Sequence, residues 1–270
     1  MSSAVPSGFF TLGASPDWHL PHPRLGLPVI MLIRRVLLRA FELLREQEYN
    51  LAAATEDQVT AALRSTIENN LRQTGEVKGF NKRMFEFVVR QGQWHNFNGT
   101  VVTKTPDLFF KLRDDDSRRA RVLSEFDGLF IEAKPMDSTH SAASNYCDDG
   151  LIRFVRGDYA WAMQEAMMLA YARDDRTILG HLIPAMNKAD RMTSLATIDL
   201  PKACPVAAAS ACPEAEAVHI SHHRRNFQWP NKRGSATDIT VYHLWHRGST
   251  QATATSTPSS APSIRKSRRA

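Results

Sequence analysis

The sequence predicts a mixed α/β domain, because patterns typical of helices and of strands alternate along it. Apolar residues recur at helical spacing between residues 30 and 71, and short β-branched or aromatic runs follow between 84 and 134. A further helix is expected over 158–172, with strands over 177–183 and 238–245 after it. This order of helix, several strands, helix and strand is typical of an α/β domain.

Two helices are expected before the first strand. Residues 1–27 are predicted to form an irregular arm, because their prolines, together with Pro28, block a helix. The segment 30–48 alternates apolar and charged residues at helical spacing, which favours a helix packed on the domain; a helix on a membrane surface is the alternative. Thr55 and Gln58 form a capping-box pattern at the start of the second helix. Its apolar stripe contains Val59, Leu63, Ile67 and Leu71.

Four short stretches of β-branched, aromatic or strongly apolar residues predict strands. They cover residues 84–90, 100–103, 106–112 and 129–133. Pro135 is expected to end the last of these strands just after Lys134. The segment 113–119 is highly charged and is expected to be a loop, and the segment 201–217 is rich in alanine and proline and is expected to be a loop or lid.

The composition is that of an ordinary globular protein: of 270 residues, 43% are hydrophobic and 23% are charged. Three cysteines are too few for a disulfide framework in a chain of this length, which favours a reducing compartment. No apolar run reaches the roughly 18 to 20 residues that a membrane span needs, and the N-terminus does not resemble a signal peptide. We therefore expect a cytoplasmic protein with no membrane partner. One domain over 28–247 would lie between the arm 1–27 and a disordered basic tail over 248–270.

The net charge of +6 is concentrated at the C-terminal end of the chain. Four positive residues lie among the last six, which leaves only +2 for residues 1–247. A weakly basic domain with a basic tail is compatible with nucleic-acid binding. A tail that is merely solvated is an equal alternative, so charge alone does not assign a partner.

One group of charged residues lies at the ends of two expected strands. Asp107 is near the start of one strand, and Glu132 and Lys134 end another. Alternate side chains of a strand point to the same face, so Glu132 and Lys134 share a face that Asp107 joins if the strands are neighbours. Two carboxylates in this arrangement bind a hard divalent cation, and an ammonium group beside them can orient water or stabilise a phosphate. These are the parts of a metal-dependent phosphodiester hydrolase; solvated strand ends or a structural salt bridge are the alternative.

Pro106-Asp107, followed by Glu132-Ala133-Lys134 after a gap of 25 residues, resembles the motif of the PD-(D/E)xK nuclease superfamily, which has the restriction-endonuclease-like fold. The resemblance covers residues 55–183, with 218–245 adding a peripheral strand. It implies an αβββαβ core with a mixed central sheet, bound Mg²⁺ or Mn²⁺, and hydrolysis of DNA or, less often, RNA. Asp107 and Glu132 would bind the metal, and Lys134 would position the water or neutralise charge in the transition state. Restriction, phage defence, repair and mobile elements all use this fold, so the biological role stays open.

The family commonly adds an acidic residue from the first helix, and Glu56 and Glu68 are the candidates. At about 100° per residue, Glu56 lies near the centre of the apolar stripe that begins at Val59, whereas Glu68 lies at its edge. A carboxylate on a buried helix face needs a partner, and a metal site supplies one. We therefore expect Glu56 at the catalytic site; an acid that stabilises the first turn of the helix is the alternative.

Residues 150–161 are unusually rich in basic and aromatic side chains. The basic ones could contact phosphates and the aromatic ones could stack on bases; the candidates are Arg153, Arg156, Tyr159 and Trp161. The resemblance adds Gln164 as a polar residue flanking the site, although Met168 stands where the exonuclease-like branch has the tyrosine of its Q-x₃-Y pattern. Packing in the core is the alternative for the aromatic residues.

A polar segment near the C-terminal end alternates on one face if it is extended; it consists of His219, Ser221, His223 and Arg225. We expect a basic strand in which His223 and Arg225 contact phosphate or substrate, with a satisfied edge strand as the alternative. Cys204 and Cys212 would complete a zinc site with the histidines. However, seven residues separate the two cysteines, against about two to four in usual zinc fingers.

Two functions follow from these observations. The first is a Mg²⁺-dependent deoxyribonuclease with Asp107, Glu132, Lys134 and Glu56 at its catalytic site. The second keeps the fold without the chemistry, as a module that binds DNA or docks a partner protein. Endonuclease or exonuclease action is open in the first, and a homodimeric state is open in both. A metabolic enzyme is disfavoured, because dinucleotide-binding, Walker and nucleophile-elbow motifs are absent from the sequence.

Overall fold

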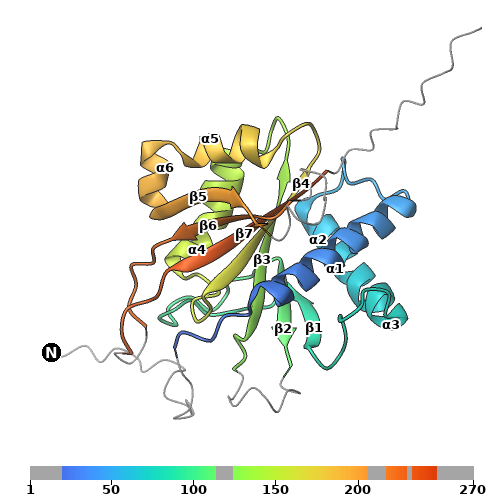
Figure 1. Ribbon diagram of the computed structural model, residues 1–270, viewed down its shortest axis with the longest axis horizontal. Coiled ribbons are helices and arrows are strands. Elements are labelled where there is room, and N and C mark those ends of the chain that lie inside the picture. The colour runs from blue at the N-terminus through green and yellow to red at the C-terminus, as the bar shows by residue number, and fades with distance from the viewer. Residues whose placement is uncertain (1–19, 114–123, 206–216, 230–232, 248–270) are drawn as a thin grey trace, which may run out of the picture.

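The computed structural model describes residues 20–113, 124–205, 217–229 and 233–247 (Figure 1). Its centre is a seven-stranded mixed sheet with the strand order β1-β2-β3-β4-β7-β6-β5. The strands are β1 (Phe85–Arg90), β2 (Leu108–Leu112), β3 (Gly128–Met136), β4 (Glu165–Ala172), β5 (Thr197–Ala203), β6 (His219–His223) and β7 (Ile239–Arg247). The three central strands β3, β4 and β7 are parallel, and every other neighbouring pair is antiparallel.

Helices flank the sheet, and several contain wide π-type turns, labelled η. They are α1 (Leu27–Glu46), α2 (Glu56–Thr66), η2 (Ile67–Leu71), α3 (Arg72–Thr74), η3 (Ala142–Leu151), α4 (Ile152–Arg156), η4 (Ile178–Leu182), α5 (Ile183–Met186) and α6 (Ala189–Ser194). The chain therefore runs from α2 through the antiparallel strands β1, β2 and β3, and then through η3 and α4 to β4. The prediction of a mixed α/β domain is confirmed. Among the described residues, every helix is too short or too polar to cross a membrane.

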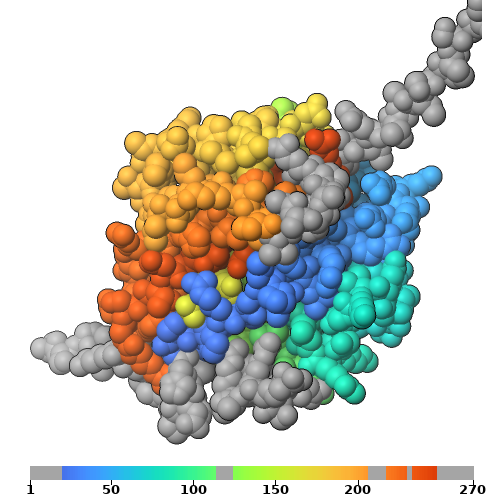
Figure 2. Space-filling view, in the orientation of Figure 1, coloured from blue at the N-terminus to red at the C-terminus, as the bar shows by residue number. Residues whose placement is uncertain are grey.

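The strand registers show which helices cover each face of the sheet. Glu132 and His243 lie in register through β4, so their side chains share a face, and the hydroxyl of Tyr146 on η3 lies 2.9 Å from Nδ1 of His243. His246, three residues further along β7, faces the opposite side, where Phe41 of α1 stacks on it with ring centroids 4.2 Å apart. Helix α1 lies along the front of the molecule in Figure 2. The sheet is therefore covered by α1 on one face and by η3 on the other.

The N-terminal helices agree closely with the sequence. Helix α1 begins at Leu27 and includes Pro28 in its first turn. A proline in the first turn costs no hydrogen bond, because the N–H groups there have no partner within the helix, so Pro28 starts the helix instead of blocking it. Helix α2 has the expected capping box: Thr55 Oγ1 accepts the N–H of Gln58, and the Gln58 side chain accepts the N–H of Thr55.

The prediction of a helix over 158–172 is wrong, because β4 occupies 165–172. Every residue of β4 is buried, and the strand lies between two parallel neighbours, β3 and β7. A strand covered on both faces needs apolar side chains on both, which removes the alternation that distinguishes a strand from a buried helix. The helical connection lies earlier in the chain, over 142–156.

Three further segments differ from their predictions. Residues 178–186 are helical rather than extended, because the Thr177 hydroxyl caps η4 by accepting the N–H of Gly180. Residues 100–103 form no strand, and Lys104 makes only an isolated bridge with Trp94. The segment 201–203 belongs to β5 rather than to a loop.

The final strand is confirmed as β7, but it lies inside the sheet between β4 and β6 rather than at its periphery. The strand expected from His219 to Arg225 is confirmed in part as β6, which ends at His223 and pairs with β7. The predictions for residues 1–19, 114–123, 206–216 and 248–270 lie outside the described residues. These include most of the charged loop, most of the lid and the whole C-terminal tail.

Pro135 does not end β3, which continues to Met136. The N–H of Ala133 points away from β4, since it donates to a residue that precedes β2. By the two-residue period of a strand, the nitrogen of Pro135 points to the same side, where the pairing of β2 with β3 has already ended at Ile131. The missing N–H of this proline therefore costs no ladder hydrogen bond.

Gly128 allows β2 and β3 to approach closely, and its replacement by alanine should destabilise the fold. A Cβ there would lie 2.3 Å from the backbone oxygen of Phe110, so one strand must shift. We expect Gly128→Ala to lower the free energy of unfolding by about 2 kcal/mol or more, measured by denaturant unfolding.

Gly75→Ala is the matched control for this substitution. Gly75 has φ +65°, but nothing lies within 4 Å of an added Cβ, so the cost is that of backbone strain alone, about 1 kcal/mol. Equal losses in the two variants would contradict the close approach at Gly128.

Candidate functional site

The candidate site lies where β2 separates from β3. The two strands pair only as far as Leu108 and Ile131, and β3 then continues to Met136. Asp107 directly precedes β2, and its Oδ2 accepts the N–H of Ala133 at 2.7 Å. A carboxylate thus takes the place of the neighbouring strand. This fixes Asp107 against the edge of β3 and opens a gap in the sheet.

Four predicted residues meet at this gap. Glu132 and Lys134 project from the same face of β3, and Glu56 comes from the first residue of α2. Lys134 Nζ lies 2.8 Å from Glu56 Oε1 and 3.1 Å from Glu132 Oε1. One carboxylate oxygen from each of Glu56, Asp107 and Glu132 lies within 4.8 Å of the other two, so these residues could hold a metal ion. Within the described part of the chain, no other group of acidic, histidine or cysteine residues has this geometry.

Glu68, the second candidate from the helical segment, has a structural role instead. Both of its oxygens accept hydrogen bonds from the Arg72 guanidinium at 2.8 Å, and Oε1 also accepts the N–H of Val88 at 2.8 Å. It therefore ties η2 to β1. The structure brings Glu56, and not Glu68, to the other carboxylates.

Burial and mutual repulsion shape the charges of the site. Burial, followed by the charges of Glu132 and Glu56, raises the pKa of Asp107 to about 8. Burial also raises the pKa of Glu132, although Lys134 and Arg153 oppose the shift. For Lys134, burial alone would lower the pKa, but the carboxylates around it outweigh burial and raise the pKa above its ordinary value. Lys134 is therefore an ammonium ion at neutral pH, and ionising all three carboxylates would place more negative charge in the site than the fold compensates.

Two residues that were expected to touch nucleic acid hold Glu132 instead. Arg153 donates to Glu132 Oε1 at 2.8 Å, and the Tyr159 hydroxyl donates to Glu132 Oε2. Tyr159 and Trp161 are buried, so the prediction that they stack on bases is wrong and the core alternative is confirmed. The contact of Tyr159 with Glu132 joins residues far apart in the sequence, so no local pattern could predict it. It forms because Gly157, at φ 73°, turns the chain back after α4.

Tyr171 was also missed as a neighbour of the site. Its hydroxyl is buried and has no hydrogen-bond partner among the described residues. Burial raises its pKa, and the charges of Glu56 and Asp107 add to that shift against the opposing effect of Arg173. Tyr171 therefore lies within the electric field of the same carboxylates. The sequence could not show this, because residue 171 was predicted to lie on a helix.

A surface groove of about 360 Å³ opens beside Glu132. Its lining includes Thr103, Lys104, Thr105, Asp148, Asp149, Ile152, Arg153, Arg156, Asp158 and Tyr159. Arg153 and Tyr159 connect it to the carboxylates, because both contact Glu132. Arg156 is exposed on its wall, as expected for a nucleic-acid contact, whereas Lys104 is bound to Asp158 at 2.7 Å. The groove therefore borders the site through Arg153 and Tyr159, and its lining carries charges of both signs.

Three other predicted nucleic-acid contacts are structural. His223 is fully buried between Ser221 Oγ at 2.8 Å and the Leu195 carbonyl at 2.9 Å, and burial lowers its pKa to about 4. Arg225 is also buried and donates to backbone carbonyls, which are those of Ala160, Trp161, Met163 and Thr237. Gln164 donates to the carbonyl of His22 at 2.8 Å. The prediction that His223 and Arg225 face a substrate is wrong, because their polar groups form hydrogen bonds inside the protein.

The suggested zinc ligands do not form a cluster within the described residues. Cys204 is buried as a free thiol, and Cys212 lies outside the described residues. His219 Nδ1 lies 3.3 Å from the carbonyl oxygen of Ala217. The structure therefore gives no support to a zinc site.

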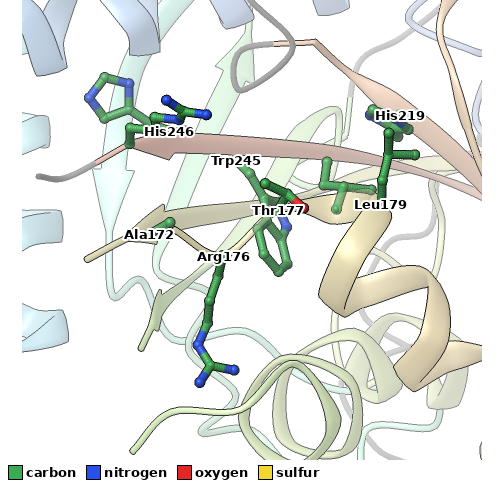
Figure 3. A pocket seen from close by; sticks show the side chains of 9 residues that line it. Ala172, Arg176, Thr177, Leu179, His219, Trp245 and His246 are labelled. Atoms are coloured by element: carbon green, nitrogen blue, oxygen red, sulfur yellow. The ribbon is translucent and has the colours of Figure 1, made fainter. Parts of the chain in front are cut away.

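A second hollow, of about 30 Å³, lies near the ends of β4 and β7 (Figure 3). This is about the volume of one water molecule. Trp245 and His246 lie on opposite sides of β7 in Figure 3, and the Arg176 guanidinium points away from Trp245. Because its polar groups do not converge, the candidate site stays at the gap between β2 and β3.

Comparisons of the chain with protein-family models, with curated proteins and with solved structures found no match. The functional argument therefore depends on the arrangement of residues at this gap. That arrangement offers three oxygen ligands of a cation, an ammonium group and an access groove.

The raised pKa of Asp107 predicts how Asp107→Asn changes stability in metal-free buffer. Folded Asp107 has a pKa of about 8, against 3.8 for the unperturbed group, so the folded state binds more protons in between and loses stability as the pH rises through that range. Asparagine keeps an acceptor for the Ala133 N–H without the charge. We expect the variant to melt about 3 °C or more above the wild type at pH 8, and by a clearly smaller margin at pH 5, in thermal unfolding with EDTA.

Asp175→Asn is the control, because Asp175 is exposed and does not belong to the cluster of Glu56, Asp107 and Glu132. It should not change the melting temperature at either pH. An Asp107→Asn variant that is less stable than the wild type at pH 8 would contradict the excess negative charge.

Proposed function

We propose that this protein is a divalent-metal-dependent nuclease that hydrolyses phosphodiester bonds of DNA. The observation that carries the proposal is the convergence of Glu56, Asp107 and Glu132, with oxygens within 4.8 Å of one another, around the ammonium group of Lys134. Carboxylates that can hold a metal ion, with an ammonium group beside them, can support metal-assisted phosphodiester hydrolysis. A groove that borders them through Arg153 and Tyr159 offers a place for a substrate to bind.

The order of elements also supports the proposal. Helix α2, the antiparallel strands β1, β2 and β3, the helical segment 142–156 and the parallel strand β4 follow one another as in the αβββαβ core of the restriction-endonuclease-like fold. Asp107 precedes the second strand, and Glu132 and Lys134 lie in the third, as the motif of the PD-(D/E)xK superfamily requires. The strands β5, β6 and β7 extend the sheet beyond that core.

The residues at the gap fit a hard divalent cation such as Mg²⁺ or Mn²⁺. Hard cations prefer oxygen ligands, and Asp107, Glu132 and Glu56 supply them. The pKa of about 8 for Asp107 reflects burial together with uncompensated negative charge, which a bound cation would neutralise. When bound there, the ion supplies Lewis-acid stabilisation of phosphate oxygens and lowers the pKa of an attacking water.

The side chains of the protein set the remaining steps. Lys134 is held between Glu56 and Glu132, and its raised pKa keeps it protonated at neutral pH. It can therefore donate hydrogen bonds to a phosphate oxygen or to the attacking water. Glu56, with its side chain 34% exposed, is the carboxylate that meets solvent at the gap. Asp107 and Glu132 are fixed by the Ala133 N–H and by Tyr159, so they offer preorganised oxygens.

Cleavage assays on plasmid and on linear single- and double-stranded DNA test the proposal. We expect cleavage with Mg²⁺ or Mn²⁺ and none with EDTA. Asp107→Asn, Glu132→Gln and Lys134→Gln should each lower the rate about 100-fold or more, because each removes a charge from the reacting centre. The products on plasmid and linear DNA separate endonuclease from exonuclease action, and a matched RNA substrate reports the sugar preference.

Asp175→Asn is the control here also, and it should cleave like the wild type. Cleavage that survives Asp107→Asn combined with Lys134→Gln would overturn the proposal. DNA binding that is equal with Mg²⁺ and with EDTA, together with no cleavage of any substrate, would favour the second function, a binding module with this fold.

A further inference from the structure

The carboxylate of Glu132 is crowded by hydrogen-bond donors. Oε1 accepts from Arg153 at 2.8 Å and lies 3.1 Å from Lys134 Nζ, and Oε2 accepts from the Tyr159 hydroxyl. These donors use three of the roughly four lone-pair positions of a carboxylate. Two of them are cations, which would face any divalent ion bound to Glu132 at close range. A metal ion can therefore bind Glu132 without strong repulsion only if one cationic donor moves away.

Arg153 is the cationic donor that can move. Lys134 is 5% exposed and is also bound to Glu56 at 2.8 Å, whereas the Arg153 side chain is 31% exposed. The second partner of Arg153 is Asp149, which is itself 63% exposed and lies one turn earlier in the same helical segment. Arg153 is thus the one cation at Glu132 that has a path into solvent, and that path leads into the groove that it lines.

We propose that Arg153 is an internal counter-ion of Glu132 that yields this carboxylate to the metal and turns into the groove to bind the substrate phosphate. The proposal rests on the function proposed above and adds a phosphate-binding residue to it. Without the metal ion, Arg153 neutralises part of the charge of Glu132 that the metal ion would otherwise neutralise. In the loaded site its planar guanidinium matches two oxygens of a phosphodiester.

Charge balance favours this exchange. When all three carboxylates are ionised, Glu56, Asp107 and Glu132 face Lys134 and Arg153, which leaves one formal negative charge. A divalent ion reverses that sign, so the loaded site attracts a phosphodiester and repels Arg153 from its contact with Glu132. Arg153 and Arg156 are three residues apart in one helical segment and both line the groove, so a displaced Arg153 would bind the same anionic chain as Arg156.

The exchange predicts opposite effects of one substitution. Arg153→Gln removes a cation that competes with the metal, so Mn²⁺ binding in the absence of DNA should become about 3-fold tighter or more by isothermal titration calorimetry. The same variant should bind a short DNA oligonucleotide about 10-fold more weakly in Ca²⁺, and it should cleave more slowly in Mn²⁺. A residue that merely supports the fold would weaken metal binding as well as DNA binding.

Arg156→Gln is the matched control, because Arg156 lines the groove from the same helix and makes no ion pair with Glu56, Asp107 or Glu132. It should weaken DNA binding and leave Mn²⁺ affinity unchanged. Arg153→Lys keeps the positive charge without the guanidinium fork, so it should keep the Mn²⁺ affinity of the wild type and lose DNA affinity. It also provides a test if Arg153→Gln does not fold.

The outcomes separate this proposal from the proposed function. Wild-type protein that binds no Mn²⁺ would overturn the metal site and, with it, the exchange. Wild-type protein that binds Mn²⁺, with an Arg153→Gln variant that binds it no tighter, would overturn the exchange alone. Unchanged DNA affinity in Arg153→Gln would overturn the phosphate-binding role of Arg153.

Discussion

The hydrogen bond from the Ala133 N–H to Asp107 is the interaction on which the arrangement of the site depends. It ends the pairing of β2 with β3 by substituting a carboxylate for a strand. The edge of β3 beyond that point is free to accept Glu56 from α2 and to contain Pro135, which could not occupy a fully paired position. One local exchange of a backbone partner for a side chain thus creates the gap and places the carboxylates in it.

Local signals in the sequence were sufficient to predict the residues at this gap. The capping box at Thr55 fixed the start of α2 and hence the position of Glu56. The two-residue period of a strand placed Glu132 and Lys134 on one face, and the apolar run after Asp107 marked it as the start of a strand. Each of these signals acts over a few residues, so tertiary contacts had little opportunity to override it.

The errors came from features that only the assembled sheet defines. Strand β4 is apolar on both sides because β3 and β7 enclose it, and its sequence alone cannot distinguish it from a buried helix. Arginine is a common phosphate contact, yet Arg225 is buried because carbonyl groups distant in the sequence accept its hydrogen bonds. Arg153 was predicted as a nucleic-acid contact, and its ion pair with Glu132, which lies 21 residues away, was not foreseen.

The same electrostatics connects stability with function. Burying Asp107 and Glu132 beside Glu56 costs free energy, and Lys134 and Arg153 offset only part of that cost. A protein selected for stability alone would replace Asp107 with a neutral acceptor, because asparagine can satisfy the Ala133 N–H without adding charge. Burial raises the pKa of Asp107 to about 8. Keeping an ionisable group at this position makes physical sense if a cation completes the site. The repulsion that ionising all three carboxylates would cause is therefore a physical reason to propose that a cation binds at this gap.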